Sequence, residues 1–170
     1  MATGFGDICN CATLVIPSTY PKIGKRGNMS KSKFVGTWKL VSLEVHLSDG
    51  TVIKPYGDNP IGMGMFDGNN FIGQLMKPNR KEFEAGNQFG GTPEEIKEAF
   101  EGYTAYFGSY EVKDDKTLVN KVEGSLYPNW IGGEQIRYYK FYDNYLDLRM
   151  PPTKMGDIEF TGLLKWERIT

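Results

Sequence analysis

The chain has 170 residues, which is enough for one domain with its own hydrophobic core. Its 20 basic and 21 acidic residues nearly balance, and this excludes the strongly basic surface with which nucleic-acid-binding proteins attract phosphate groups. Its one histidine and two cysteines do not cluster with further metal-ligating residues, so we expect neither a metal ion nor another cofactor.

Residues 1–30 differ in character from the rest of the chain. They hold Gly, Pro, Ser and Asn without clear hydrophobic periodicity, so we predict a partly disordered extension ahead of one domain at 31–170. They lack a basic start followed by the roughly 7–15-residue apolar run of a secretory signal. No apolar run approaches the roughly 18 residues of a membrane span. We therefore expect a soluble, cytoplasmic protein with no membrane partner.

The domain is dominated by short alternating or β-rich runs that are separated by turn signals. Joining consecutive strands by tight turns makes a meander, and closing the meander removes its two exposed edges. We predict an all-β fold, an up-and-down antiparallel barrel of eight or nine strands. The runs lie at about 34–47, 51–54, 62–67, 70–76, 103–112, 117–126, 134–142, 145–149 and 158–168.

One short helix is predicted near 92–101. Thr92 can cap it, Pro93 occupies its first position, Glu95 completes a capping box and Gly102 ends it. Its apolar side chains share one face, which would pack against the barrel or form a mobile lid over a cavity. These side chains are Ile96, Ala99 and Phe100.

The two ends of the domain are expected to meet. Gly36, Thr37 and Trp38 form a G-x-W pattern in the first strand, and Arg168 shares a face with Trp166 at the end of the last strand. An inward guanidinium needs an aromatic face or carbonyl groups, and the Trp38 ring can supply the aromatic face in a cation–π stack.

These features are marks of the lipocalin barrel, a calycin-type fold. The chain resembles, more specifically, the small lipocalin-like domain family of bacteria and fungi over about residues 33–168. Where members of that family often have a histidine before the segment VEGS, this chain has Asn120 or Lys121. The resemblance rests on the segments GTWKLVS, PYGDNPIGMGMFDGNNFIGQLM, TPEEIKEAFEGYTAYFGSYEV, VEGSLYPNW, YLDLRMPP and LLKWER.

Strand alternation raises one question about the first strand. If Trp38 points inward, alternation brings Glu44 and the histidine His46 to the interior as well. A bulge after Ser42 would instead turn Leu43 inward and the polar pair toward water. Both arrangements remain open from the sequence.

Other residues are candidates for ligand contact. Arg137 shares its strand face with Tyr139, and if buried it needs a carboxylate such as Glu44 or Glu123, or an anionic ligand group. Trp130 lies in a Pro/Gly-rich loop where it would close the barrel mouth. The candidate ligand-binding residues are Trp38, Gln74, Phe71, Met65, Tyr103, Tyr139 and Trp130.

The resemblance implies that the barrel binds a small hydrophobic molecule, and a buried Arg137 leaves an anionic group on that molecule as an option. Because some barrels similar to lipocalins, such as allene oxide cyclases and certain fungal pericyclases, are cofactor-free cyclases, catalysis stays open. A cyclase or isomerase of specialised metabolism would use His46, Glu44 and Arg137 as catalytic residues. A third alternative is a filled barrel that binds proteins, and a homodimer is a further option.

Overall fold

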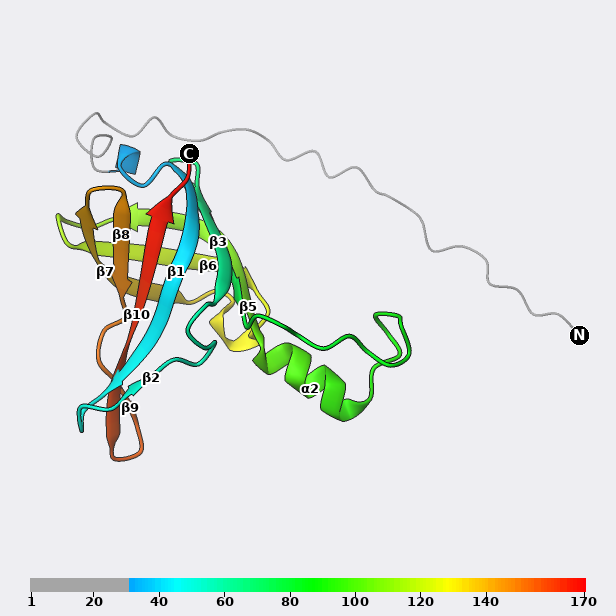
Figure 1. The fold of residues 1–170 in the computed structure, drawn as a ribbon. Helices are drawn as coiled ribbons and strands as arrows, with labels where there is room; N and C mark the ends of the chain where they lie inside the picture. The colour runs from blue at the N-terminus through cyan, green and yellow to red at the C-terminus, as the bar shows by residue number, and fades with distance from the viewer. Residues whose placement is uncertain (1–30) are drawn as a thin grey trace, which may run out of the picture.

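The computed structural model describes residues 31–170, and the predicted extension at 1–30 lies outside the described residues. The described part is a β-barrel with one helix, α2 (Pro93–Glu101), projecting from it (Figure 1). A short 3₁₀ helix, η1 (Pro128–Trp130), precedes β7. The strands are β1 (Gly36–Leu47), β2 (Val52–Ile53), β3 (Ile61–Phe66), β4 (Asn70–Met76), β5 (Tyr103–Val112), β6 (Thr117–Ser125), β7 (Glu134–Tyr142), β8 (Tyr145–Arg149), β9 (Thr153–Met155) and β10 (Ile158–Arg168).

The strands form a closed antiparallel meander. β1 pairs with β3 on one side and with β10 on the other, so the ring consists of β1, β3 to β8 and β10. The short strands β2 and β9 add to the far parts of β1 and β10, which continue past the ring (Figure 1). The predicted up-and-down barrel and its strand order are confirmed, and closure leaves the ring without an unpaired edge.

Aromatic side chains fill the barrel end at which β1 begins. Phe34 and Trp38 are almost fully buried, and the Trp38 Nε1 donates a hydrogen bond to the Phe34 carbonyl at 2.8 Å. The Arg168 guanidinium lies 4.1 Å from the centre of the Trp38 ring and donates to the carbonyls of Lys33 and Val35. The predicted stack is confirmed, and it ties the two ends of the domain together across this closed end.

A bulge in β1 decides which of its side chains face inward. Leu40 pairs with the buried Trp166, but Ser42 pairs with the next residue, Lys165, so one extra residue of β1 is accommodated between them. Beyond the bulge Leu43 joins the hydrophobic core, and the even-numbered residues that follow turn to the outer face.

Glycines occupy the interior positions of β3. A Cβ atom at Gly62 would lie 2.8 Å from the Leu40 Cβ, and a Cβ atom at Gly64 would lie 3.5 Å from the Trp166 ring. The large side chains of β1 and β10 thus take the space that larger residues on β3 would need, and the Met63 and Met65 side chains face outward, about half exposed.

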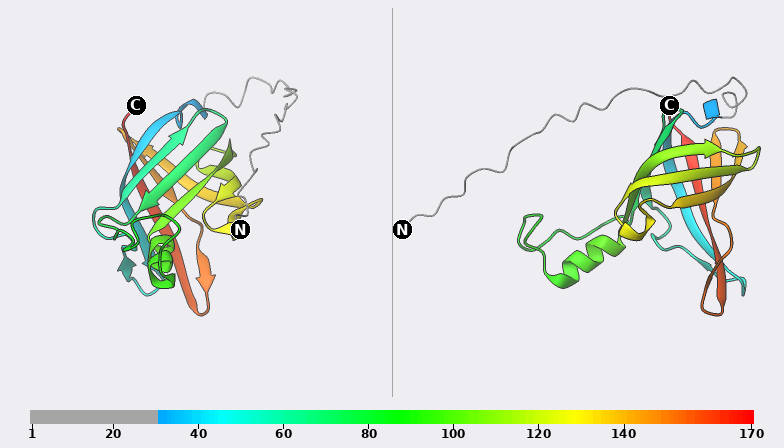
Figure 2. Two further views of the ribbon diagram at one scale, coloured as in Figure 1. Left: turned by 90° about the vertical axis from the view of Figure 1, so that its right-hand side faces the viewer. Right: turned by 180° about the vertical axis from the view of Figure 1, so that it is seen from behind.

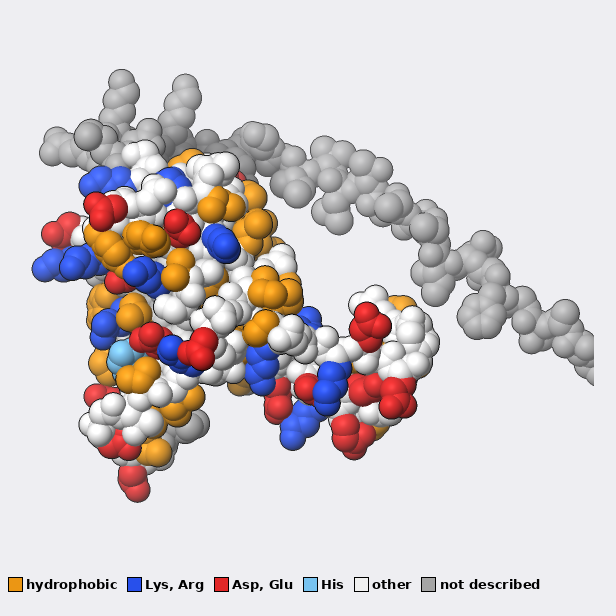
Figure 3. All heavy atoms as spheres, viewed as in Figure 1, with side chains coloured by type: hydrophobic (Ala, Val, Ile, Leu, Met, Phe, Trp, Pro, Cys, Tyr) orange, Lys and Arg blue, Asp and Glu red, His pale blue; other side chains and the backbone are white. Residues whose placement is uncertain are grey.

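Helix α2 has the predicted caps. The Thr92 side chain accepts from the Glu95 backbone N–H, and the Glu95 carboxylate accepts from the Thr92 N–H. The helix and the preceding loop, residues 77–92, project away from the barrel (Figures 1 and 2). The helix contains no buried residue, and Ile96 and Phe100 are 51% and 44% exposed, so the predicted packing on the barrel is not found. Charged side chains gather over this projecting part (Figure 3).

Candidate functional site

The barrel interior keeps a small cavity of about 20 Å³ beneath the aromatic closed end. Gly64 of β3 and Gly73 of β4 pair with each other, and because they lack side chains, one wall of the cavity is formed by their backbone atoms. Most of the other walls are aromatic or aliphatic, as is typical of a site for an apolar molecule. They include Trp38, Phe66, Phe71, Tyr106, Leu148 and Trp166.

Two polar atoms at this cavity lack hydrogen-bond partners. Asn120 of β6 is 1% exposed and Trp166 of β10 is 5% exposed, and both residues line the cavity. Among the residues that the structure describes, no group bonds to the Asn120 Oδ1 or to the Trp166 Nε1. Leaving a buried donor or acceptor unpaired costs about 1–3 kcal/mol. The pair is therefore a buried polar feature that no group of the described residues satisfies.

Arg137 lies on the same interior face, beside Asn120. The register of β6 and β7 pairs Asn120 with Gln135 and Leu118 with Arg137. Arg137 is 5% exposed, and its guanidinium donates to the Ile136 carbonyl at 2.8 Å and to the Gln135 Oε1 at 3.2 Å. The predicted interior position is thus found, and this cation forms no ion pair with any carboxylate within residues 31–170.

The barrel mouth holds a second, more open hollow of about 240 Å³. Tyr106 connects the two spaces, because it lines the interior cavity and its ring packs edge-on against Trp130, with 5.4 Å between ring centres. On its other side Tyr106 packs against Phe71 at 5.2 Å. The hollow is lined by Tyr56, Phe100, Glu101, Tyr103, Thr104, Leu126, Tyr127 and Trp130.

Five of the predicted ligand-binding residues lie in the interior or at the mouth. Trp38 and Phe71 line the cavity, and Trp130 and Tyr103 line the hollow at the mouth. Tyr139 packs against Phe34 in the closed end and donates from its hydroxyl to the Asp114 carbonyl at 2.9 Å. It therefore belongs to the aromatic end rather than to the cavity wall.

The other two, Met65 and Gln74, are exposed on the outer face of the barrel, contrary to the interior position that was predicted. Tyr103 begins β5 at the mouth, where it lines the hollow and its hydroxyl donates a hydrogen bond to the Gln74 side chain. Strand alternation misled the prediction here because apolar residues occupy both faces of β3 and β4.

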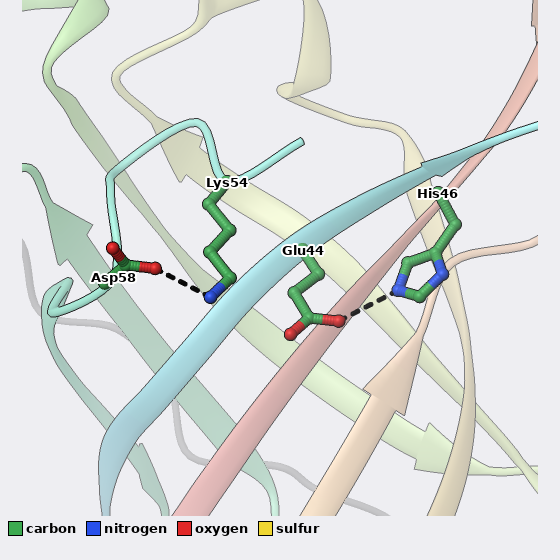
Figure 4. Close-up of polar contacts among 4 residues, drawn as sticks. All are labelled: Glu44, His46, Lys54 and Asp58. Carbon is green, nitrogen blue, oxygen red and sulfur yellow. Dashed lines mark hydrogen bonds and ion pairs between the residues drawn. The ribbon is translucent and has the colours of Figure 1, made fainter. Parts of the chain in front are cut away.

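Glu44 and His46 lie on the outer face of β1, beyond the bulge. The His46 Nε2 and the Glu44 Oε2 are 2.9 Å apart, and Lys54 and Asp58 form a neighbouring ion pair at 2.7 Å (Figure 4). The hydrogen bond from Lys54 lowers the pKa of Asp58. Of the two arrangements that the sequence left open, the structure has the one with the polar pair turned outward, so this acid–base pair does not face the cavity.

Neither Asn120 nor Trp166 was predicted from the sequence to contact a ligand. Asn120 was noted only at the point where the chain departs from the family it resembles. Asn120 lies two residues from both Leu118 and Val122, so the three side chains share one face of β6. Because Leu118 and Val122 are apolar and buried, this spacing would have predicted that Asn120 faces the interior. The missing hydrogen bonds of Asn120 and Trp166 depend on distant strands, so only the assembled barrel reveals them.

A larger hollow of about 320 Å³ lies outside the barrel, between residues 77–84 and helix α2. Its walls mix charges of both signs, including Arg80, Lys81, Glu84 and Glu98. Such a lining is unlike the apolar interior cavity.

Two further properties concern the whole described part of the chain. Within residues 31–170 no group of three or more His, Cys, Asp or Glu side chains is placed to hold a metal ion. In the same part, no helix has the length and apolar character needed to cross a membrane.

One family model and several known proteins are similar to this chain. The family model described as a lipocalin-like domain matches residues 35–169. The 4'-hydroxy-3'-methoxypropiophenone carrier protein ppsC of Aspergillus oryzae is 32% identical over 104 residues, which are 56% of this chain and 94% of that protein. A solved lipocalin-like protein from Bacteroides uniformis has 15% identity and a TM-score of 0.42, covering 80% of this chain and 98% of its own. A redesigned β barrel has 12% identity and a TM-score of 0.38, with coverages of 82% and 95%.

Proposed function

Because the chain belongs to the lipocalin-like domain family, we propose that it is a carrier that holds one small, largely apolar molecule inside its barrel. The relative in Aspergillus oryzae, by its name, carries 4'-hydroxy-3'-methoxypropiophenone, and this supports a small-molecule cargo here. Binding of this kind requires only shape, burial and a few placed polar groups.

The observation that carries the proposal is the pair of unpartnered polar atoms at the interior cavity. Asn120 and Trp166 are nearly fully buried, and each holds a polar atom without a partner among residues 31–170. Burying such groups destabilises the folded protein unless another molecule satisfies them. A bound molecule that meets both atoms would offset this cost, and the surrounding aromatic walls would bury its apolar body.

The bound molecule needs more room than the cavity now has. A volume of about 20 Å³ suits a single water-sized group, whereas typical ligand pockets measure about 300–1,000 Å³. No hydrogen bond of the Tyr106 hydroxyl is found in the described part of the chain, and packing against Phe71, Trp130 and Gly73 holds this side chain. Rotation of Tyr106 would join the cavity to the hollow at the mouth, with the polar end of the cargo kept at Asn120.

Arg137 adds a preference for negative charge. Its guanidinium is 5% exposed and bonds to two uncharged oxygens, and the absence of a carboxylate partner among residues 31–170 supports an anionic group on the cargo. We therefore extend the proposal to cargo that carries an acidic group as well as an apolar body. The cyclase alternative gains no support from Glu44 and His46, because both lie outside the barrel.

Native mass spectrometry of protein purified gently from its host, followed by extraction and identification of bound compounds, tests the proposal. We expect a stoichiometric small molecule, and the same spectra report whether the chain forms a homodimer. A mass equal to that of the bare chain, together with no rise in melting temperature across a panel of apolar and anionic compounds, would instead favour a filled barrel that binds proteins.

A further inference from the structure

Asn120 and Trp166 both line the interior cavity, and each holds one unpartnered hydrogen-bonding atom. The Asn120 Oδ1 only accepts hydrogen bonds, and the Trp166 Nε1 only donates them. Each lacks a partner among residues 31–170, and the two residues belong to different strands, β6 and β10. A single group can satisfy both atoms only if it both donates and accepts.

We infer that the two residues form a hydroxyl subsite, in which a phenol group of the cargo donates to the Asn120 Oδ1 and accepts from the Trp166 Nε1. This inference rests on the proposed function and names the chemistry of the cargo's polar end. A ketone, ether or carboxylate only accepts hydrogen bonds and would leave the Asn120 oxygen unpaired. An ammonium group only donates and would leave the indole N–H unpaired.

The walls favour an aromatic body for the hydroxyl compound. The rings of Phe66, Phe71 and Tyr106 line the cavity, and edge-to-face packing of aromatic rings adds to the stabilisation from burial alone. The Trp166 and Tyr106 rings lie over the glycine pair of β3 and β4, so rotation of Tyr106 would uncover the backbone of Gly73 for a planar ring. A volume of about 20 Å³ accommodates the hydroxyl end, and the ring extends toward Tyr106 and the mouth.

A matched pair of probes tests the hydroxyl subsite. The first is 4'-hydroxy-3'-methoxypropiophenone, and the second is 3',4'-dimethoxypropiophenone, in which the hydroxyl group is methylated. Isothermal titration calorimetry on the full chain should show at least about tenfold tighter binding of the phenol, because the ether cannot donate to Asn120. In Asn120→Leu the phenol and the ether should bind with nearly equal affinity. The control Gln74→Leu removes an amide from the outer face and should keep the wild-type preference.

A second measurement uses the unmodified protein, so that it does not depend on the folding of a variant. The indole N–H signals of the tryptophans are followed by NMR while each ketone is added. The Trp166 signal should move downfield with the phenol and much less with the ether, because only the phenol places a firmly held acceptor there. The Trp38 N–H already donates to the Phe34 carbonyl, so its shift reports the ring current of the bound ketone without a new hydrogen bond.

Equal affinity for the two ketones, an unmoved Trp166 signal or no binding of either ketone would each overturn the hydroxyl subsite. If host-purified protein nevertheless carries a stoichiometric compound without a hydroxyl group, the carrier function stands and the subsite inference fails. If host-purified protein carries nothing and the panel has no effect, the carrier function itself fails.

Discussion

At the scale of single residues, Arg137 is the buried charged side chain of the barrel interior. Its guanidinium is held by carbonyl oxygens of Ile136 and Gln135 rather than by a carboxylate. Taking a cation out of water costs several kcal/mol, and neutral hydrogen bonds recover only part of that cost. Arg137 is therefore expected to weaken the empty barrel while it helps to hold an anionic cargo.

Replacing Arg137 by Met tests whether the buried charge lowers the stability of the empty barrel. We expect the free energy of unfolding of the ligand-free protein to rise by about 1 kcal/mol, because the buried charge is removed and the side chain keeps much of its volume. Urea denaturation measures the change. Lys39→Met, an exposed lysine of β1, is the matched control and should change the free energy by less than about 0.5 kcal/mol. A loss of several kcal/mol in Arg137→Met would contradict the expectation.

Tyr110 makes the closed end sensitive to alkaline pH. Burial in the core, with a smaller contribution from the Asp67 charge, raises the pKa of Tyr110 to about 12. The unfolded chain releases this proton near pH 10, so the folded state keeps it to higher pH and stability falls as the pH rises from about 10 to 12. The loss is at most about 1.4 kcal/mol per pH unit for one such group.

Tyr110→Phe should remove this part of the pH dependence. In urea denaturation at pH 8 and pH 11, the wild type is expected to lose about 1 kcal/mol more than the variant. Tyr139 and Tyr142 also have raised pKa values, so some alkaline loss remains in the variant. An identical loss in the two proteins would show that Tyr110 ionises alike in the folded and unfolded states.

The residues of the site differ in how far the sequence could predict them. Trp38 and Arg168 were predictable because a guanidinium at the end of a strand needs a partner and the chain ends must meet. Asn120 and Trp166 were not, because whether a polar side chain has a partner depends on strands that are far apart in the sequence. Met65 and Gln74 were placed inside because nothing local revealed that Trp166 fills the space over Gly64.

At the scale of elements, the bulge in β1 determines the chemistry of both barrel faces. It turns Leu43 into the core and leaves Glu44 and His46 outside. Leu43→Ala should lower the free energy of unfolding by about 2 kcal/mol. Glu44→Ala and His46→Ala should each change it by less than about 1 kcal/mol, because exposed ion pairs contribute little. A larger loss in His46→Ala than in Leu43→Ala, measured by chemical denaturation, would contradict this orientation.

The Glu95 carboxylate binds helix α2 to its preceding loop, beside the Arg80 hydrogen bond to the Ala99 carbonyl. Glu95 accepts from the Glu84 N–H at 2.9 Å and from the Thr92 N–H at 2.7 Å, and these bonds lower its pKa. Their stabilisation is present above the ordinary glutamate pKa and is lost as the pH falls through the lowered value. Glu95→Ala should speed amide hydrogen exchange in residues 84–101 and leave the melting temperature of the barrel unchanged.

The neighbouring Glu94 provides the control for this variant, since it is exposed and accepts neither bond. Glu94→Ala should leave hydrogen exchange in residues 84–101 close to that of the wild type. Equal protection in Glu95→Ala and Glu94→Ala would show that the carboxylate does not hold the loop.

The boundaries of α2 were predictable from its capping residues, but its position was not. Capping is local, so Thr92, Pro93 and Glu95 suffice to mark the start of the helix. Where the helix packs depends on the geometry of the whole barrel, and Ile96 and Phe100 remain about half exposed. The bulge was likewise one of two open alternatives. Apolar residues occupy both odd and even positions of β1, so the sequence pattern does not show where an extra residue is inserted.

At the scale of the whole molecule, the meander could be predicted because its turns are local and its closure is demanded by unpaired edges. The result is a container with one end filled by aromatic residues and the other lined by a hollow around Trp130. The size of the space between them could not be predicted, because it depends on how Tyr106 and Trp166 pack over the glycines of β3 and β4.

The central claim is that cargo binds inside the barrel, and the affinity of 4'-hydroxy-3'-methoxypropiophenone for Gly64→Ala tests it most directly. The added methyl group would lie 3.5 Å from the Trp166 ring, an ordinary contact that preserves the fold while taking space from the cavity. Met63→Ala, on the outer face of the same strand, is the control. We predict at least about tenfold weaker binding to Gly64→Ala, a loss of about 1.4 kcal/mol, and wild-type affinity for Met63→Ala. Wild-type affinity in Gly64→Ala combined with weaker binding to Met63→Ala would place the cargo on the outer face and contradict the account.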